Sequence, residues 1–223
     1  MKILIIGSGG REHAIAHKLS LSERKPVLFA APGNAGIVAL ATCVDLAVDD
    51  LEGLLAFVKA QQVDLTIVGP ELPLVLGIVD LFESNGLRIF GPNKASAQFE
   101  GSKDFTKAFL ARHGIPTAHS ETHVALEPAL EALSRFDYPV VIKADGLAAG
   151  KGVIIAEDHQ TAIRALSEIM DGRIFGNSGD KVVLETFLKG IEASILCFVD
   201  GETILPMQPA QDYKKIYTFL YLM

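Results

Sequence analysis

The stretch that decides the fold is KADGLAAGKGVIIA, residues 143–156, in which two lysines flank a turn of glycines and alanines. Backbone N–H groups in such a turn can approach an anion closely, and a lysine ammonium can neutralise its charge. The stretch is therefore typical of a loop that holds phosphate. The alternative is a tight turn with solvated lysines, so neighbouring segments have to decide between the two.

Two familiar phosphate-binding motifs do not fit the sequence. The interval from Gly146 to Gly150 is one residue too short for a P-loop, and Gly152 stands where that motif needs serine or threonine. Residues 7–12, GSGGRE, supply two glycines of the dinucleotide fingerprint but place Glu12 at the third glycine position. Neither a Walker motif nor a firm dinucleotide motif is present.

The pattern favours a glycine hairpin that folds over a nucleoside triphosphate. Lys143 ends the incoming strand, and Lys151 lies beyond the turn. The glycines would let the hairpin stay open until the anion arrives. Charge-assisted contacts of this kind contribute roughly 1.5–3 kcal/mol each when they are shielded from water.

The segment VVLETFLKGIEAS, residues 182–194, supports a nucleotide site. Glu185 ends a predicted strand, residues 186–188 form a short apolar linker, and Glu192 opens the next strand. An apolar backbone segment suits an adenine ring, and a carboxylate beyond it suits ribose hydroxyls. Each acid alone would be interpreted as a solvated surface charge, but the lysine hairpin makes the combination informative.

Residues 1–101 predict an open α/β domain with a parallel sheet, similar to a Rossmann fold. Short apolar runs such as KILIIG and VDLTIVG alternate with helix-length segments, which is typical of parallel strands joined by crossover helices. Three strands end in glycine, at Gly7, Gly69 and Gly91. Ligands bind at the carboxyl ends of such strands, so we expect GSGG, APGNAG and GPE to converge there.

Residues 102–223 predict a second domain of α+β type. Ser102 is placed to cap a helix that ends near Gly114, and Asp158 to cap another. The strands in YPVVIKAD and GVIIAED pair as a hairpin across the glycine turn, within a lid subdomain of about residues 120–192. The final YKKIYTFLYLM lacks a turn residue, which indicates an edge strand or a truncated protein.

The composition excludes several classes of partner. The chain of 223 residues is 49% hydrophobic and carries a formal net charge of −7, which argues against a nucleic-acid surface. Apolar runs are too short to span a bilayer, so we expect no membrane association and a cytoplasmic location. Cys43 and Cys197 have no metal-ligand spacing, and we expect both to be buried small apolar residues.

Six segments together resemble the phosphoribosylamine–glycine ligase (glycinamide ribonucleotide synthetase) family of purine biosynthesis. They are GSGGREHA (7–14), APGNAG (31–36), GPE (69–71), GSKDFTK (101–107), KADGLAAGKGV (143–153) and ETFLKGIEAS (185–194). The resemblance covers residues 1–212. It implies an open α/β domain followed by a partial ATP-grasp domain. It also implies ligation of glycine to phosphoribosylamine through glycyl phosphate, while ATP is split to ADP and phosphate.

The resemblance also implies the site residues. Lys103 and Lys143 would hold ATP phosphates, with Lys143 as the catalytic cation, and the hairpin Gly146, Gly150, Lys151 and Gly152 would cover them. Glu185 and Leu188 would meet the adenine, and Glu192 the ribose. The phosphoribosylamine pocket would be lined by Gly9, Gly10, Asn34 and Glu71, since helix N-termini suit a phosphate. We expect His13 to be structural, orienting the first helix.

The sequence departs from the family after QDYKKIY. Family members continue into a glycine-rich segment, then an acid and an asparagine that bind Mg²⁺ or Mn²⁺, and a C-terminal domain. We expect these parts to be missing here, so we assign no metal ligand. We therefore expect the chain alone to be inactive or nearly so as a ligase. The alternatives are a non-catalytic nucleotide-binding fragment and an NAD-dependent dehydrogenase. The oligomeric state stays open.

Overall fold

The computed structural model describes residues 1–148 and 151–211. The chain divides into two compact units, residues 1–187 and 188–223. The first unit contains a five-stranded and a four-stranded sheet, and the second contains a two-stranded sheet. The predicted terminal segment 213–223 lies outside the described residues.

The five-stranded sheet is parallel throughout and runs in the order β3-β2-β1-β4-β5. Its strands are β1 (Lys2–Gly7), β2 (Val27–Pro32), β3 (Thr42–Cys43), β4 (Leu65–Val68) and β5 (Ile89–Phe90). The predicted open parallel sheet is confirmed. The chain reverses its direction of travel across the sheet between β1 and β4, so the loops after these two strands diverge and leave a crevice.

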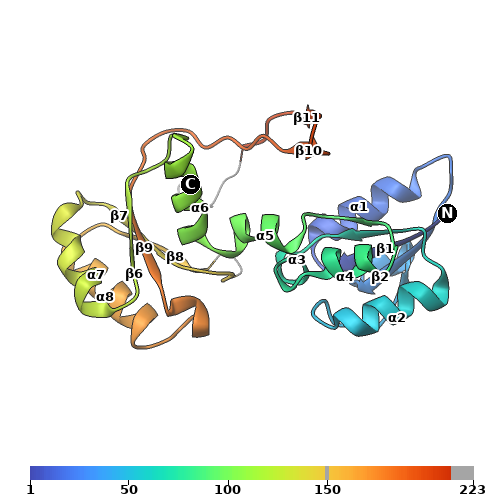
Figure 1. Ribbon diagram of the computed structural model, residues 1–223, viewed down its shortest axis with the longest axis horizontal. Helices are drawn as coiled ribbons and strands as arrows, with labels where there is room; N and C mark the ends of the chain where they lie inside the picture. Colours follow the sequence, from blue (N-terminus) through green and yellow to red (C-terminus); the bar gives the residue numbers. More distant parts are fainter. Residues whose placement is uncertain (149–150, 212–223) are drawn as a thin grey trace, which may run out of the picture. The chain divides into compact units, whose positions relative to one another are not determined.

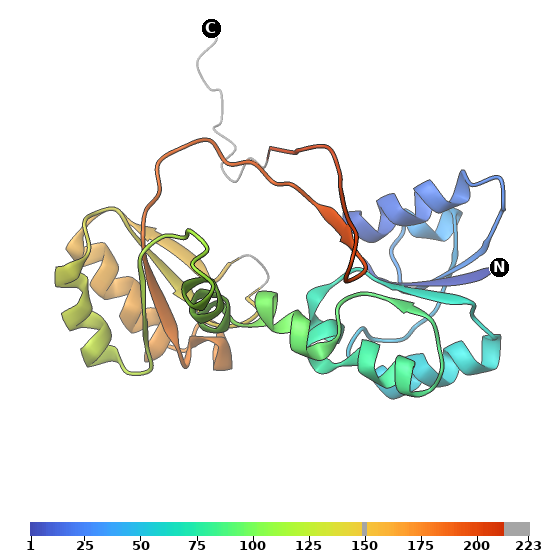
Figure 2. The ribbon, with the colours of Figure 1, turned by 45° about the horizontal axis from the view of Figure 1, so that its top comes forward.

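Both faces of this sheet are covered by helices. Leu4 and Ile6 pack on one face with α2 (Leu51–Gln61) and α4 (Ile78–Ser84), whereas Ile3 and Ile5 pack on the other with α1 (Gly10–Ser20). Figures 1 and 2 show α1 on the opposite side of the sheet from α2 and α4. Burial on both faces explains why KILIIG is apolar without alternation. The helices α3 (Glu71–Leu76) and α5 (Lys94–Gly101) follow β4 and β5.

The four-stranded sheet is antiparallel and runs in the order β6-β9-β7-β8. Its strands are β6 (Ser120–His123), β7 (Val140–Ala144), β8 (Val153–Ala156) and β9 (Val182–Thr186). The predicted hairpin across the glycine turn is confirmed by the pairing of β7 with β8. The helices α7 (Leu126–Ala132) and α8 (His159–Met170) cover one face, and α6 (Lys103–Arg112) lies on the other side (Figure 1).

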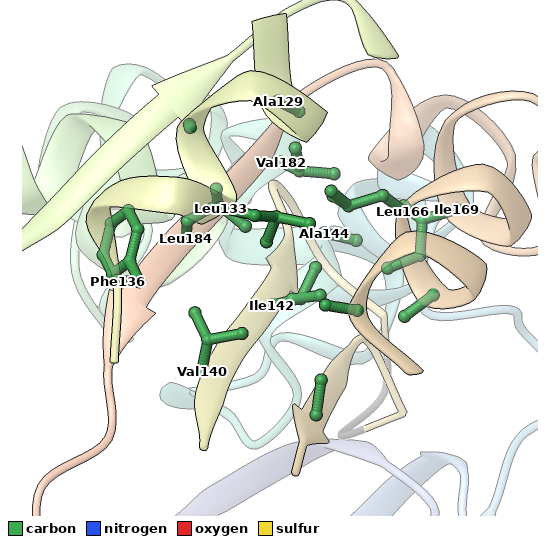
Figure 3. Close-up of a cluster of buried hydrophobic side chains, with 14 residues drawn as sticks. Ala129, Leu133, Phe136, Val140, Ile142, Ala144, Leu166, Ile169, Val182 and Leu184 are labelled. Carbon is green, nitrogen blue, oxygen red and sulfur yellow. The ribbon is translucent and has the colours of Figure 1, made fainter. Parts of the chain in front are cut away.

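The core of this sheet lies between its strands and α7 and α8. Val140, Ile142 and Ala144 alternate along β7, are fully buried, and face Leu166 and Ile169 of α8 (Figure 3). The intervening residues Val141 and Lys143 are only partly buried. Because successive side chains of a strand point to opposite faces, Lys143 projects from the face opposite the core.

The second unit contains the hairpin of β10 (Cys197–Val199) and β11 (Ile204–Pro206), whose residues are exposed. Cys197 is therefore exposed and Cys43 only partly buried, so the expectation that both are buried is wrong. Among the described residues of the second unit, β10 pairs with β11 alone, which leaves Cys197 exposed. Among the described residues, the helices are too short or too polar to cross a membrane.

Candidate functional site

A buried carboxylate with two lysines marks the base of the glycine hairpin. The Glu185 side chain is 8% exposed, and its Oε2 lies 2.8 Å from Lys143 Nζ and 3.4 Å from Lys107 Nζ. The predicted pair of Lys143 and Glu185 therefore meets in one place. Two ammonium groups beside one carboxylate leave a net positive charge, which suits an anionic ligand.

Strand register explains this meeting. Val141 of β7 pairs with Glu185 of β9, so both point to the same face, and Lys143 follows two residues further along that face. Lys107 reaches the cluster from α6, which lies on the same side of the sheet. The sequence reasoning missed Lys107. Its available signal was the spacing of four residues from Lys103, which places both lysines on one helix face.

The two lysines differ in how firmly they are held. Lys107 Nζ also donates to Thr117 Oγ1 at 2.8 Å and to the Ala118 carbonyl at 3.1 Å, and its side chain is 14% exposed. Within the described residues, the Lys143 ammonium has Glu185 as its hydrogen-bond partner, and its side chain is 26% exposed. Lys107 is therefore held by more partners than Lys143, which has more hydrogen-bonding capacity left among the described residues.

A second cluster joins the start of α6 to the end of β7. Asp145 Oδ1 accepts the backbone N–H of Lys103 at 2.6 Å and of Asp104 at 3.1 Å. Lys103 Nζ donates to the Gly146 carbonyl at 2.9 Å. Burial lowers the pKa of Lys103 below its ordinary value of 10.5, although the nearby Asp145 carboxylate raises it in part. Sequence reasoning found Lys103 but missed Asp145.

The predicted N-cap of α6 is confirmed, because Ser102 Oγ accepts the Phe105 N–H at 3.1 Å. Asp104, in the first turn, has a pKa lowered chiefly by a hydrogen bond from the Thr122 side chain and further by Lys181. Lys181 Nζ lies 3.1 Å from Asp104 Oδ2. These contacts tie α6 to the sheet from two directions.

The glycine hairpin lines a cavity of about 670 Å³. Its lining includes Lys103, Gly146, Gly152 and Arg11 but neither Lys143 nor Glu185, so the predicted phosphate-binding lysines belong to two adjoining clusters rather than to one wall. Gly146 has a φ of +104°, a conformation that favours glycine. Lys151 is exposed, and the predicted Gly150 lies outside the described residues.

The loop after β1 lines a second cavity of about 410 Å³ at the predicted crevice, together with Pro70 and Glu71. Glu12 is 4% exposed, and its Oε2 accepts the Gly9 N–H at 2.5 Å, which is the one half of a capping box that a glycine N-cap allows. An added Cβ at Gly69 would lie 1.9 Å from Glu12 Oε1. The Glu12 side chain thus fills the space between the two strand-end loops and occupies the Gly9 N–H.

Glu71 and Asn34, the other predicted crevice residues, make contacts within the loops that surround the crevice. Glu71 Oε1 lies 3.0 Å from Arg11 Nη1, which also donates to the Gly69 carbonyl at 2.6 Å. Asn34 Nδ2 donates to the Ser8 carbonyl at 2.8 Å. The Arg11 side chain is 62% exposed and lines both cavities. Sequence reasoning missed Arg11, although it adjoins the two glycines in GSGGRE.

Four further predicted residues remain, and the first of them, Gly10, also lines the second cavity. Gly10 begins α1, and an added Cβ there would meet nothing within 4 Å. The ring of His13 lies against Gly36, since a Cβ at Gly36 would come within 2.5 Å of His13 Cε1. Leu188 and Glu192 are exposed residues of the second unit, so their predicted contacts with adenine and ribose stay predictions.

Carboxylates and histidines do not gather into a metal site in residues 1–148 and 151–211. No group of three or more His, Cys, Asp or Glu side chains in these residues could hold a metal ion. These residues therefore offer no ready-made site of three protein donors for the divalent cation that the resemblance implies.

Comparison with known proteins identifies the family. The N-domain model of phosphoribosylglycinamide synthetase matches residues 1–100, and the model of its ATP-grasp (A) domain matches residues 101–218. Phosphoribosylamine–glycine ligase of Caldanaerobacter subterraneus is 54% identical over 217 residues, which are 97% of this chain and 52% of that protein. The enzyme of Pseudomonas putida is 54% identical over 218 residues, covering 97% of this chain and 50% of that protein.

Solved structures agree with the family models. The crystal structure of phosphoribosylamine–glycine ligase from Thermotoga maritima superposes with a TM-score of 0.81 at 32% identity, covering 96% of this chain and 51% of that one. The chain spans about half the length of the curated relatives that it matches. The predicted ATP-grasp fold in the second part of the chain is confirmed. On these matches, the chain belongs to the phosphoribosylglycinamide synthetase family.

Proposed function

We propose that this chain binds ATP and a sugar phosphate for the joining of glycine to 5-phosphoribosylamine, a cytoplasmic step of purine biosynthesis. The observation that carries the proposal is the cluster of Lys143, Glu185 and Lys107 at the base of the glycine hairpin, in a chain of this family. The name of its relatives, phosphoribosylamine–glycine ligase, supplies the reaction.

The reaction needs no protein nucleophile. A carboxylate oxygen of glycine attacks the γ-phosphorus of ATP, and ADP leaves. The amine of phosphoribosylamine then attacks the carbonyl carbon of glycyl phosphate, loses a proton, and releases phosphate as the amide bond forms. The protein contributes by positioning the reactants, by stabilising charge on the phosphoryl group and by excluding water from the acyl phosphate.

In this proposal the lysines share the phosphates of ATP. Lys143 has N–H groups without a partner among the described residues, and it takes the catalytic role beside the transferring phosphoryl group. Lys103 holds phosphate oxygens in the cavity that Gly146 and Gly152 line, and Lys151 closes over them with the hairpin. Glu185 and Leu188 meet the adenine, and Glu192 meets the ribose hydroxyls.

The crevice after β1 and β4 takes the sugar phosphate. Arg11 supplies the cation for the 5′-phosphate, because its exposed side chain lines the 410 Å³ cavity. Gly10 leaves open space for a close approach. Asn34 shapes the loop beside it, and Glu71 holds Arg11 in place.

Calorimetric titration of the chain with ATP tests the proposal. We expect saturable ATP binding, and we expect ribose 5-phosphate to bind separately and to lose affinity in Arg11→Ala. A thermal shift with NAD but none with ATP would instead favour a dehydrogenase. That outcome conflicts with the position of Glu12, whose carboxylate stands where a pyrophosphate would need a free Gly9 N–H. Binding of ATP without that of ribose 5-phosphate would favour a nucleotide-binding fragment.

A further inference from the structure

The start of α6 has no backbone donor left for a phosphate. The Gln98 carbonyl accepts the N–H of Ser102 at 2.9 Å, Asp145 accepts those of Lys103 and Asp104, and Ser102 Oγ accepts that of Phe105. The first four N–H groups of a helix are the ones that normally lack partners. An anion at this end must therefore be held by the lysine side chain.

The carboxylate that accepts the first N–H groups of α6 belongs to Asp145, which lies 42 residues after Lys103 in the sequence. Asp145 follows β7 directly and its side chain is 11% exposed. Its own N–H donates to the Lys181 carbonyl at 2.9 Å, so its backbone is anchored to the strand that follows α8. Ser102 Oγ contacts both of its carboxylate oxygens, at 3.2 and 3.1 Å. The side chain is thus held on each side and has little freedom to move away.

The same junction fixes the lysine. The Lys103 backbone is bound to Asp145, and its ammonium donates to the carbonyl of Gly146, the next residue along the hairpin. Lys103 and Gly146 both line the 670 Å³ cavity. The Asp145 carboxylate therefore sets the position of the start of α6 and, through it, the position of the Lys103 side chain, which lines the cavity.

We propose that Asp145 is a positioning residue for nucleotide binding, which caps α6 from the end of β7 and thereby holds Lys103 at the cavity. This proposal rests on the proposed ATP site. It assigns Asp145 the geometry of the junction rather than a contact with ATP. An amide oxygen at this position could accept the same two N–H groups, so the charge is dispensable and the acceptor is not.

The experiment compares Asp145→Ala with Asp145→Asn in the full chain. We expect Asp145→Ala to weaken ATP binding by about tenfold or more, which is the effect of one lost charge-assisted contact. We expect Asp145→Asn to stay within about threefold of the wild type. An Asn variant as weak as the Ala variant would overturn the proposal.

Asp158→Ala is the matched control. Asp158 caps α8 by accepting the Thr161 N–H at 2.8 Å, so its loss also removes an aspartate cap from the first unit. We expect this variant to bind ATP within about twofold of the wild type. An equal loss in both cap variants would mean that ATP binding follows general stability, which contradicts a positioning role.

Two further measurements separate this inference from the proposed function. In a Lys103→Met background, Asp145→Ala should add no further loss of ATP affinity, because Asp145 acts through Lys103. Without ATP, amide exchange at Lys103 and Asp104 should speed up in Asp145→Ala and stay slow in Asp145→Asn. Unchanged exchange, or additive losses, would overturn the inference alone. A wild-type chain that binds no ATP would overturn the proposed function as well.

Discussion

The contrast between Lys143 and Lys107 yields the sharpest prediction, because both lysines contact Glu185 but differ in their other partners. We expect Lys143→Met to weaken ATP binding by roughly 10- to 150-fold, which corresponds to one charge-assisted contact of roughly 1.5–3 kcal/mol. Calorimetric titration measures this loss. The exposed Lys18 on α1 supplies a surface control, and Lys18→Ala should leave the affinity unchanged.

We expect Lys107→Met to lower the free energy of unfolding more than Lys143→Met does. Lys143→Met leaves Glu185 paired with Lys107, so we expect a loss of roughly 1 kcal/mol, or about 2–4 °C in Tm. Lys107→Met leaves the buried Ala118 carbonyl without its lysine donor and removes one of the two cations that contact Glu185. We expect it to cost roughly 2–3 kcal/mol, or about 4–12 °C in Tm.

The pattern across the two variants tests the reasoning. Affinity should fall most in Lys143→Met, and Tm should fall most in Lys107→Met. Both are read at one pH and one salt concentration, since ionic contacts weaken with salt. If the two variants lose ATP affinity equally and Tm equally, the cluster acts as one structural unit. The assignment of Lys143 to the ligand would then be refuted.

Three other predictions follow from single contacts. Burial lowers the pKa of Lys103 below its ordinary value of 10.5, so its ammonium loses its proton at a lower pH than a solvated lysine does. ATP affinity should therefore fall as the pH rises into the alkaline range. In Lys103→Arg, which stays charged, a pH series of titrations should show a smaller fall in affinity. Gly69→Ala should cost roughly 1–3 kcal/mol by urea denaturation because its Cβ would strike Glu12, whereas Gly10→Ala, which meets nothing, should be neutral. Leu166→Ala, at a fully buried position in α8, should cost roughly 2–5 kcal/mol in the same assay.

The fold of the first unit could be predicted because its signals are local. The apolar strands, the glycines that end them and the capping residues Ser102 and Asp158 each act over a few positions of sequence. The pairing of β7 with β8 followed from the short turn between them. The exposure of Cys197 could not be read in this way, because it depends on whether a second layer covers β10.

The sequence named Lys143 and Glu185 from two separate motifs, and strand register brings them together in the structure. Each ends a strand, which is a local signal, but the pairing of the two strands is not. Lys107 and Asp145 act through contacts between α6 and the sheet, which no local pattern specifies. Glu12 was visible as a departure from the glycine fingerprint, but its capping role needed the geometry of the β1 loop.

Carboxylates occupy backbone donors at two helix starts that face the cavities. Glu12 takes the Gly9 N–H before α1, and Asp145 takes the first N–H groups of α6. Helix starts commonly bind phosphate through backbone N–H groups. At both of these helix starts, fewer N–H groups are left for a phosphate. In the proposed function, the anions are therefore bound by side-chain cations that line the cavities, namely Arg11 and Lys103. The affinity of this chain for phosphates should therefore depend on salt and, through the lowered pKa of Lys103, on alkaline pH.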